Sequence, residues 1–132
     1  MRIFLDANIL FSASQPHSWM RAFLDVLFDQ AECLTNAYAV EEARRNLALK
    51  FPAALRHLDA LVGKCELVSA VVTDLKVELA AKDVPILGGA IAGQATHLLT
   101  GDERDFGVFF GKTLQGVKVV SPRMLAEELR LS

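Results

Sequence analysis

Four acidic residues stand at positions from which they could form a divalent-metal site. Asp6 directly follows the apolar run 3–5, and Asp102 follows the apolar run HLLT in the segment TGDERDF. Glu42 lies in YAVEEARRNL, and Asp83 lies in KDVP. An isolated carboxylate in a dry core would take up a proton rather than stay ionised. We therefore expect Asp6 to have a partner or a chemical task.

Carboxylates that meet at one place need a cation between them. Two like charges about 4 Å apart, at an effective dielectric constant near 20, repel by roughly 4 kcal/mol. Oxygen ligands favour Mg²⁺ or Mn²⁺, whereas a structural zinc site would need cysteine or histidine ligands, and the chain offers no suitable histidine pair. Acidic clusters that hold these ions most often bind phosphates through the metal.

The elements predicted around these acids alternate between strands and helices. We expect strands over residues 2–5, 32–34, 65–68, 96–100 and 117–120. We expect helices over residues 14–29, 36–49, 52–63, 74–82, 85–95 and 122–131, with Ser14, Asn36 and Thr73 as N-caps. This order predicts βαβ units and a mostly parallel sheet. Open sheets of this kind bind ligands outside the carboxyl ends of their strands, which is where Asp6 and Asp102 fall.

Length and composition predict one globular domain over residues 1–132. The chain has 132 residues, of which 52% are hydrophobic, and a formal net charge of −2. This charge gives no global attraction for nucleic acid, so local cations or metals would have to supply it. Charges interrupt every apolar stretch well before the roughly 20 residues that a membrane span needs, and we expect a cytoplasmic protein without membrane contact.

Other chemically notable residues have plain structural interpretations. Cys33 and Cys65 lack the spacing of a metal or redox motif and are expected to be buried, reduced thiols. Scattered histidines are expected in structural or surface roles: His17, His57 and His97. Aromatic residues at helical spacing are expected in the core, although they could line a groove for a partner helix: Trp19, Phe23 and Phe28.

Three segments, taken in order, resemble the PIN-domain family. They are IFLDANILFSA, YAVEEARRNL and KDVPILGGAIAGQATHLLTGDERDF, and they reach from the first third of the chain to the last. The third is the most specific, because it joins KDxP, a small-residue helix, an apolar strand and TGDxxxF. The resemblance implies a three-layer α/β/α fold with a central, mostly parallel sheet of about five strands. The PIN-domain family includes stand-alone proteins such as VapC-like toxin ribonucleases, and the resemblance extends to these.

The resemblance also implies which residues act. Asp6, Glu42, Asp83 and Asp102 match the family's four acids, which would be both the metal ligands and the catalytic residues. Glu42 is preferred to Glu41 because the family's glutamate usually precedes a leucine by five positions, as Glu42 precedes Leu47. All four acids also have simple structural explanations. Asp6 could be a strand-end acid that caps a helix, Glu42 a solvated helix residue, Asp83 an N-cap, and Asp102 a turn residue.

Supporting roles extend to neighbouring polar residues. Asn8 matches the family's polar residue two positions after the first acid, and Thr100 matches the hydroxyl residue that orients the last one. Asp105 is a possible auxiliary acid, although a turn or cap role fits it better. Ala7 departs from the threonine of many members, which puts one secondary hydrogen bond in doubt. Cations near the acids could contact RNA phosphates or simply be solvated: Arg44, Arg45, Lys82 and Arg104.

The expected function is endoribonucleolytic cleavage that depends on Mg²⁺ or Mn²⁺. A metal-activated water would attack the phosphodiester and leave a 5′-phosphate and a 3′-hydroxyl. The family further suggests the toxin of a bacterial toxin–antitoxin pair, with an antitoxin partner and a possible homodimer. The alternatives are a non-catalytic PIN-fold module that binds RNA or protein, and an aspartyl-phosphate protein. The last is disfavoured because DAN lacks the second acid of a DxD phosphatase motif.

Overall fold

A six-stranded sheet forms the centre of the protein, whose computed structural model describes residues 1–130. The strand order is β3-β2-β1-β4-β6-β5, and all neighbours are parallel except β5 and β6. The bounds are Arg2–Leu5 (β1), Glu32–Thr35 (β2), Glu66–Leu67 (β3), His97–Leu99 (β4), Thr113–Leu114 (β5) and Val117–Val120 (β6). The five predicted strands are present. The sixth, β5, is added by a tight turn in which Gln115 and Gly116 both have positive φ.

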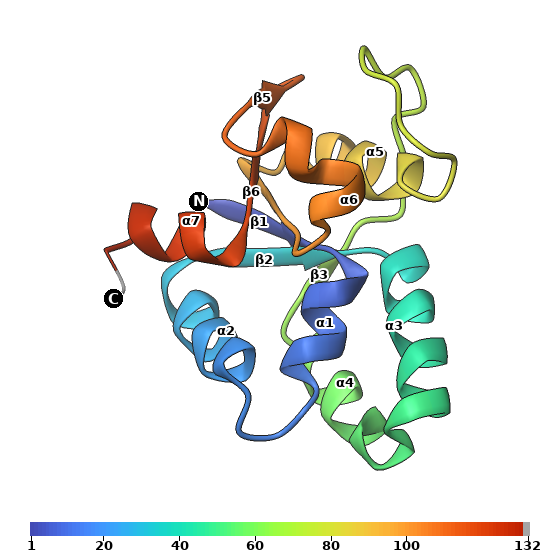
Figure 1. The fold of residues 1–132 in the computed structure, drawn as a ribbon, viewed down its shortest axis with the longest axis vertical. Coiled ribbons are helices and arrows are strands. Elements are labelled where there is room, and N and C mark those ends of the chain that lie inside the picture. Colours follow the sequence, from blue (N-terminus) through green and yellow to red (C-terminus); the bar gives the residue numbers. More distant parts are fainter. Residues whose placement is uncertain (131–132) are drawn as a thin grey trace.

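Helices cover both faces of the sheet, as the predicted α/β/α fold requires. One side carries α1 (Ala7–Ala13), α2 (Trp19–Gln30), α3 (Ala37–Lys50) and α4 (Leu55–Val62) (Figure 1). The other side carries α5 (Val84–Ala92) and α6 (Glu103–Phe106), and α7 (Pro122–Glu128) follows β6. Short 3₁₀ turns precede α4 (Pro52–Ala54) and follow α6 (Gly107–Phe109). The predicted helix over 122–131 extends past α7 to residue 131, which lies outside the described residues.

The central strands are apolar because both of their faces are covered. Ile3, Phe4 and Leu5 of β1 are fully buried, and so are Leu98 and Leu99 of β4. This near-continuous apolar character is typical of parallel strands packed between two helical layers. It also explains why the first polar residue after β1 falls at the carboxyl edge of the sheet.

The prediction of one helix over residues 14–29 was wrong at its start. Helix α1 begins directly after Asp6, and Ser14 ends it, with its backbone N–H donating to the carbonyl of Leu10. Ser18 then caps α2 by accepting a hydrogen bond from the Arg21 backbone N–H. This cap places Trp19 in the first turn of α2, 58% exposed, so Trp19 is not a core residue. Phe23 is buried and Phe28 is half-buried, as predicted for the core.

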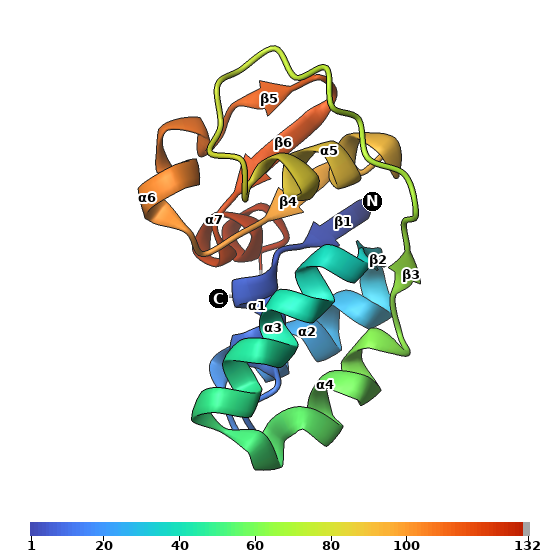
Figure 2. The ribbon, with the colours of Figure 1, turned by 90° about the vertical axis from the view of Figure 1, so that its right-hand side faces the viewer.

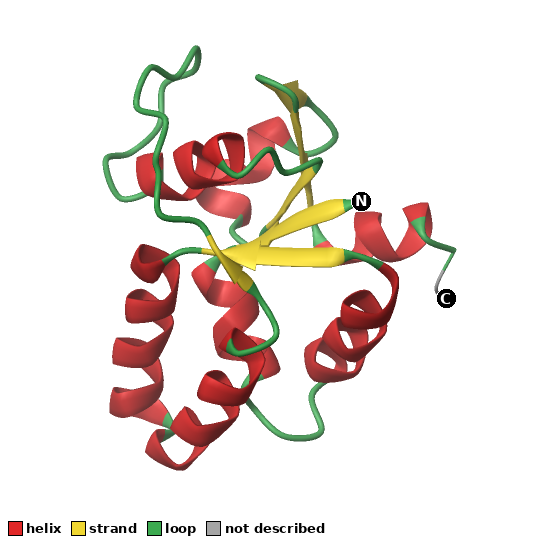
Figure 3. Ribbon diagram, turned by 180° about the vertical axis from the view of Figure 1, so that it is seen from behind, coloured by secondary structure: helices red, strands yellow, loops and turns green. Residues whose placement is uncertain are grey.

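The predicted helix over residues 74–82 is absent, and that segment forms a loop instead (Figure 3). Its apolar residues Leu75, Val77 and Leu79 alternate with exposed ones, which is the period of an extended chain. The chain just before this segment packs against α5, where the backbone N–H of Val72 donates to the carbonyl of Gly88 at 3.0 Å. A Cβ at Gly88 would lie 2.2 Å from the Val72 carbonyl oxygen, so glycine is required for this close approach.

Several smaller predictions concern single residues. Cys33 is buried, and burial raises the pKa of its thiol to about 12, which suppresses the reactive thiolate. His97 is buried and its Nε2 lies 2.9 Å from Glu128 Oε1, so it joins β4 to α7 as a structural histidine. Within residues 1–130, no helix combines the length and the apolar character needed to cross a lipid bilayer.

Candidate metal centre

Asp6 lies between β1 and α1, and its carboxylate accepts hydrogen bonds from three donors. Its Oδ1 accepts from the backbone N–H of Ala7 at 2.6 Å. Its Oδ2 accepts from Thr100 Oγ1 at 2.7 Å and from Asn8 Nδ2 at 3.1 Å. Burial raises the pKa of Asp6, while the hydrogen bonds from Thr100 and Ala7 oppose this shift. The carboxylate is thus held in one orientation at the sheet edge.

Asn8 and Thr100 connect the ends of β1 and β4. Asn8 Oδ1 accepts from the backbone N–H of Gly101 at 2.7 Å, and Thr100 Oγ1 accepts from the backbone N–H of Asp102 at 3.1 Å. Thr100 is fully buried, so its hydroxyl has little freedom to turn elsewhere. These two side chains therefore fix the position of Asp102 relative to Asp6.

Asp83 occupies the N-cap position of α5, but it does not act as a capping residue. Its side chain makes no capping hydrogen bond to the helix. Its Oδ2 is buried and accepts no hydrogen bond from any group in residues 1–130. Burial raises the pKa of this carboxyl to about 6, and the nearby Lys82 ammonium acts in the opposite direction. A buried carboxylate oxygen without a partner is costly, and such atoms in folded proteins call for an explanation such as an ion.

Two further acids stand beside Asp83. One carboxylate oxygen from each of Asp83, Asp102 and Asp105 lies within 4.8 Å of the other two. Lys82 Nζ is 2.6 Å from Asp105 Oδ2, 3.6 Å from Asp83 Oδ1 and 3.9 Å from Asp102 Oδ2. The Lys82 hydrogen bond lowers the pKa of Asp105. The cluster therefore already contains one cation, the Lys82 ammonium.

The four predicted acids line one pocket of about 180 Å³. In Figure 2 the start of α1, the chain after β4 and the side of α3 come together at the carboxyl end of the sheet. Glu42 reaches the pocket from α3 and is half-buried, whereas Glu41 is exposed. The remaining lining residues are Ala7, Asn8, Phe11, Asn46, Lys50 and Lys82. Elements far apart in sequence thus bring all four acids to one place.

The donor set of this pocket fits a hard divalent cation. Asp6, Glu42, Asp83 and Asp102 offer carboxylate oxygens, and among residues 1–130 no histidine or cysteine lines the pocket. Oxygen-only ligands suit Mg²⁺ or Mn²⁺ and not a structural zinc. The buried Asp83 Oδ2, which has no hydrogen-bond partner among residues 1–130, is an oxygen that a cation in this pocket would satisfy.

Cations predicted near the acids are not all at the pocket. Lys82 lines it, but Arg44 pairs with Asp59 of α4 at 2.9 Å, and Arg45 and Arg104 are exposed and do not line it. Lys50 lines the pocket and was not among the predicted residues, because it lies eight positions after Glu42 at the end of α3. The helical spacing of Glu42, Asn46 and Lys50, four residues apart, would have indicated that they share a face.

Removing Lys82 is expected to strengthen binding of a divalent ion. The ammonium and the ion carry like charge and compete for the same carboxylates, so we expect Lys82→Met to bind Mn²⁺ about tenfold more tightly. Isothermal titration calorimetry measures this directly. Lys76→Met is the matched control, because Lys76 pairs only with Asp74 on the exposed loop. Weaker Mn²⁺ binding by Lys82→Met would show instead that Lys82 orients the ligands.

Asp83 is expected to make the stability of the metal-free protein fall with rising pH. Its pKa is about 6 in the folded chain against 3.8 as the ordinary value, so the folded state holds the proton more tightly. Its contribution to stability is therefore full below about pH 4 and is lost as pH rises through 6. In EDTA, Asp83→Asn should gain stability over the wild type between pH 4 and 7 by urea unfolding. A difference in unfolding free energy between the two proteins that stays constant across that pH range would contradict this assignment.

Comparison with known proteins supports the fold. No family model and no curated protein matches the chain in sequence. Among solved structures, it is similar to a chain of VapBC2 from Rickettsia felis, in a crystal structure of that complex bound to a DNA fragment from their promoter. The TM-score is 0.67 at 19% identity, over 92% of this chain and 98% of the other. The six-stranded, helix-covered sheet and this structural match together show that the chain has the PIN-like α/β/α fold that its sequence resembles.

Proposed function

We propose that the protein is an endoribonuclease that depends on Mg²⁺ or Mn²⁺ and cleaves RNA phosphodiester bonds at the acidic pocket. The observation that carries the proposal is that four acids, Asp83 among them, line one pocket, and that the buried Oδ2 of Asp83 has no hydrogen-bond partner among residues 1–130. A hard cation held by these carboxylates would suit phosphate chemistry. We propose that the protein acts in the cytoplasm, where it would encounter its RNA substrate.

The four acids of the pocket, and the two polar residues that orient Asp6, have roles that follow from their surroundings. Asp6, Asp83 and Asp102, with Glu42 from the facing helix, would hold the cation. When bound, Mg²⁺ or Mn²⁺ lowers the pKa of a coordinated water and stabilises negative charge on the phosphate. Thr100 and Asn8 keep Asp6 oriented through their hydrogen bonds.

Cations at the pocket complete the proposed site. Lys82 balances the charge of the carboxylates, and Lys50 offers an ammonium at the rim for a phosphate of the RNA. With water as the attacking group, no side chain has to form a covalent intermediate. The products would carry a 5′-phosphate and a 3′-hydroxyl.

Cleavage of a mixed-sequence structured RNA tests the proposal. The purified wild type is incubated with Mg²⁺, with Mn²⁺ or with EDTA, and the ends of the fragments are analysed. The proposal predicts cuts that require the metal and yield 5′-phosphates. Calorimetric metal binding without cleavage of any RNA would instead favour a non-catalytic PIN-fold binding module.

We further propose that the protein is the toxin of a toxin–antitoxin pair. Support comes from the structural match to a chain of the VapBC2 complex from Rickettsia felis. The surface between α2 and α7 adds to it, because a groove of about 1140 Å³ there has Trp19, Met20, Phe110, Pro122 and Ala126 among its lining residues, together with charged residues such as Glu103 and Arg123. Exposed apolar grooves of this kind are typical of protein-binding surfaces. A small protein encoded beside this chain should copurify with it and suppress cleavage.

A further inference from the structure

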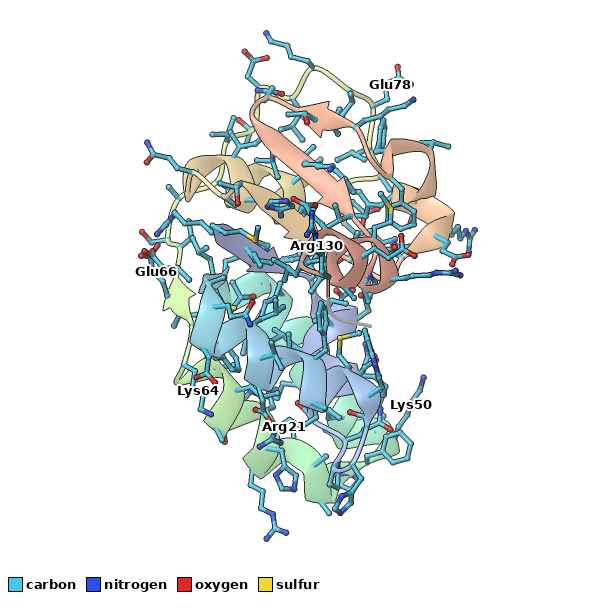
Figure 4. All side chains as sticks on the ribbon, turned by 90° about the vertical axis from the view of Figure 1, so that its left-hand side faces the viewer. Arg21, Lys50, Lys64, Glu66, Glu78 and Arg130 are labelled. Atoms are coloured by element: carbon cyan, nitrogen blue, oxygen red, sulfur yellow. The ribbon has the colours of Figure 1, made fainter. Side chains whose placement is uncertain are left out.

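Part of the acidic pocket is lined by an aromatic residue, Phe11, and a basic residue, Lys50. Phe11 and Lys50 both line the pocket, and Lys50 Nζ lies 5.7 Å from the centre of the Phe11 ring. Phe51 follows, with its ring centre 6.0 Å from that of Phe11, and it is 47% exposed. Lys50 is labelled in Figure 4 at the edge of the helical half of the molecule. An exposed aromatic side chain thus adjoins the acidic pocket.

A second hollow lies beside Phe51. It has a volume of about 450 Å³, and Phe51 forms part of its wall. Its other lining residues are Gln15, Pro16, Pro52, Ala53, Ala54, Arg56 and His57, and none of them is acidic. The acidic pocket and this hollow are therefore joined by the pair Phe11 and Phe51.

The cations along this path are not neutralised by the protein. Within residues 1–130, neither Lys50 nor Arg56 forms an ion pair with a carboxylate, whereas Arg44 and Lys82 both do. In a chain with a net charge of −2, such positions are where a polyanion would be attracted locally.

We infer that a single-stranded segment of RNA runs from the acidic pocket over Phe11 and Phe51 into the hollow beside Arg56. Phe51 would stack on a base, and Lys50 and Arg56 would contact phosphates. A strand must be unpaired to offer its base faces to an aromatic ring, which is why a single strand fits and a duplex does not. Continuity with the acids and the free cations favour RNA over a second copy of this acidic chain.

The inference rests on the proposed function, because it names the path of that substrate. We would measure fluorescence anisotropy of a labelled, mixed-sequence single-stranded RNA of ten nucleotides, using an Asp6→Asn background in Mg²⁺ to prevent cutting. Phe51→Ala should weaken binding about tenfold, as expected for loss of one stacked base. Arg56→Gln should reduce the slope of log affinity against log salt by about 0.7, the value for one phosphate contact to a single strand.

Matched controls separate this surface from general effects. Leu49→Ala changes a residue that is 84% exposed at the same end of α3, and Lys112→Gln removes an exposed cation elsewhere; both should bind RNA like the parent. The inference is overturned if Phe51→Ala binds like Leu49→Ala, or if the parent does not bind the RNA. It is also overturned if light scattering shows that Phe51→Ala breaks up a dimer and that this loss of the dimer accounts for the weaker RNA binding.

Failure of the inference and failure of the proposed function give different results. If the wild type cuts RNA with metal but Phe51→Ala binds unchanged, the RNA path is wrong and the proposed function stands. If the wild type cuts no RNA under any metal condition, the proposed function is wrong whatever the hollow binds.

Discussion

Asp6→Asn is expected to lower the rate of RNA cleavage at least about a thousandfold. Asp6 is the most constrained acid of the pocket, with 4% exposure and three hydrogen-bond donors on its carboxylate. The amide keeps the shape but removes the charge that would hold a cation, and it offers a donor where Thr100 also donates. Losing about 4 kcal/mol of transition-state stabilisation corresponds to this factor.

The measurement is a single-turnover cleavage rate with saturating Mg²⁺ on the RNA that the wild type cuts. Glu41→Gln is the matched control, because it also removes one negative charge but from an exposed position next to Glu42. Circular dichroism and urea unfolding check that both variants remain folded. Retention of most activity in Asp6→Asn would move the active site away from this pocket.

Phe4→Ala is expected to cost about 3–5 kcal/mol of unfolding free energy, the usual range for a phenylalanine in a core. Phe4 is fully buried in the central strand β1, where α5 packs closely enough that a Cβ at Gly89 would lie 3.2 Å from the Phe4 ring. Domains of this size are stable by about 5–15 kcal/mol, so the loss is a large fraction of the total. Urea unfolding followed by circular dichroism measures it.

Val108→Ala serves as the comparison for Phe4→Ala. Val108 is 70% exposed, so its truncation should change the unfolding free energy by less than about 0.5 kcal/mol. A cost below about 1 kcal/mol for Phe4→Ala would mean that the two helical layers are not joined through β1 as the structure describes.

Much of the fold could be predicted because buried parallel strands are recognisable in the sequence as short apolar runs. The run Ile3–Leu5 is apolar without interruption and β6 is apolar except for Lys118, since both sheet faces are covered. Asn36 marks the start of α3, where its side chain accepts a hydrogen bond from the Ala39 backbone N–H. These local signals agree with the tertiary structure, so the prediction was correct there.

The errors lie where tertiary contacts decide the conformation. The segment 74–82 is rich in helix-forming residues, but it is an extended loop whose apolar side chains alternate with exposed ones and pack against the core. Ser14 and Ser18 are both suitable caps, and only the end of α1 at Ser14 decides between them. Trp19 is apolar at helical spacing, yet the direction of α2 leaves it on the surface.

The candidate site was partly predictable for a different reason. Asp6 and Asp102 follow strands that lie side by side, so sheet topology alone places them together. Glu42 and Asp83 come from helices, and their place in the set rested on the family resemblance. Lys50 and Phe51 carry no recognisable motif, because what makes them notable is the neighbouring Phe11, forty residues away in the chain.

Calorimetric titration of Mn²⁺ into the wild type and into Asp83→Asn tests the central claim most directly. The claim is that the buried, unpartnered oxygen of Asp83 belongs to a site for a divalent ion. The account predicts a saturable binding heat for the wild type at pH 7 and its loss, or at least a tenfold weaker affinity, in the variant. Equal binding by the two proteins, or no binding by either, would contradict it.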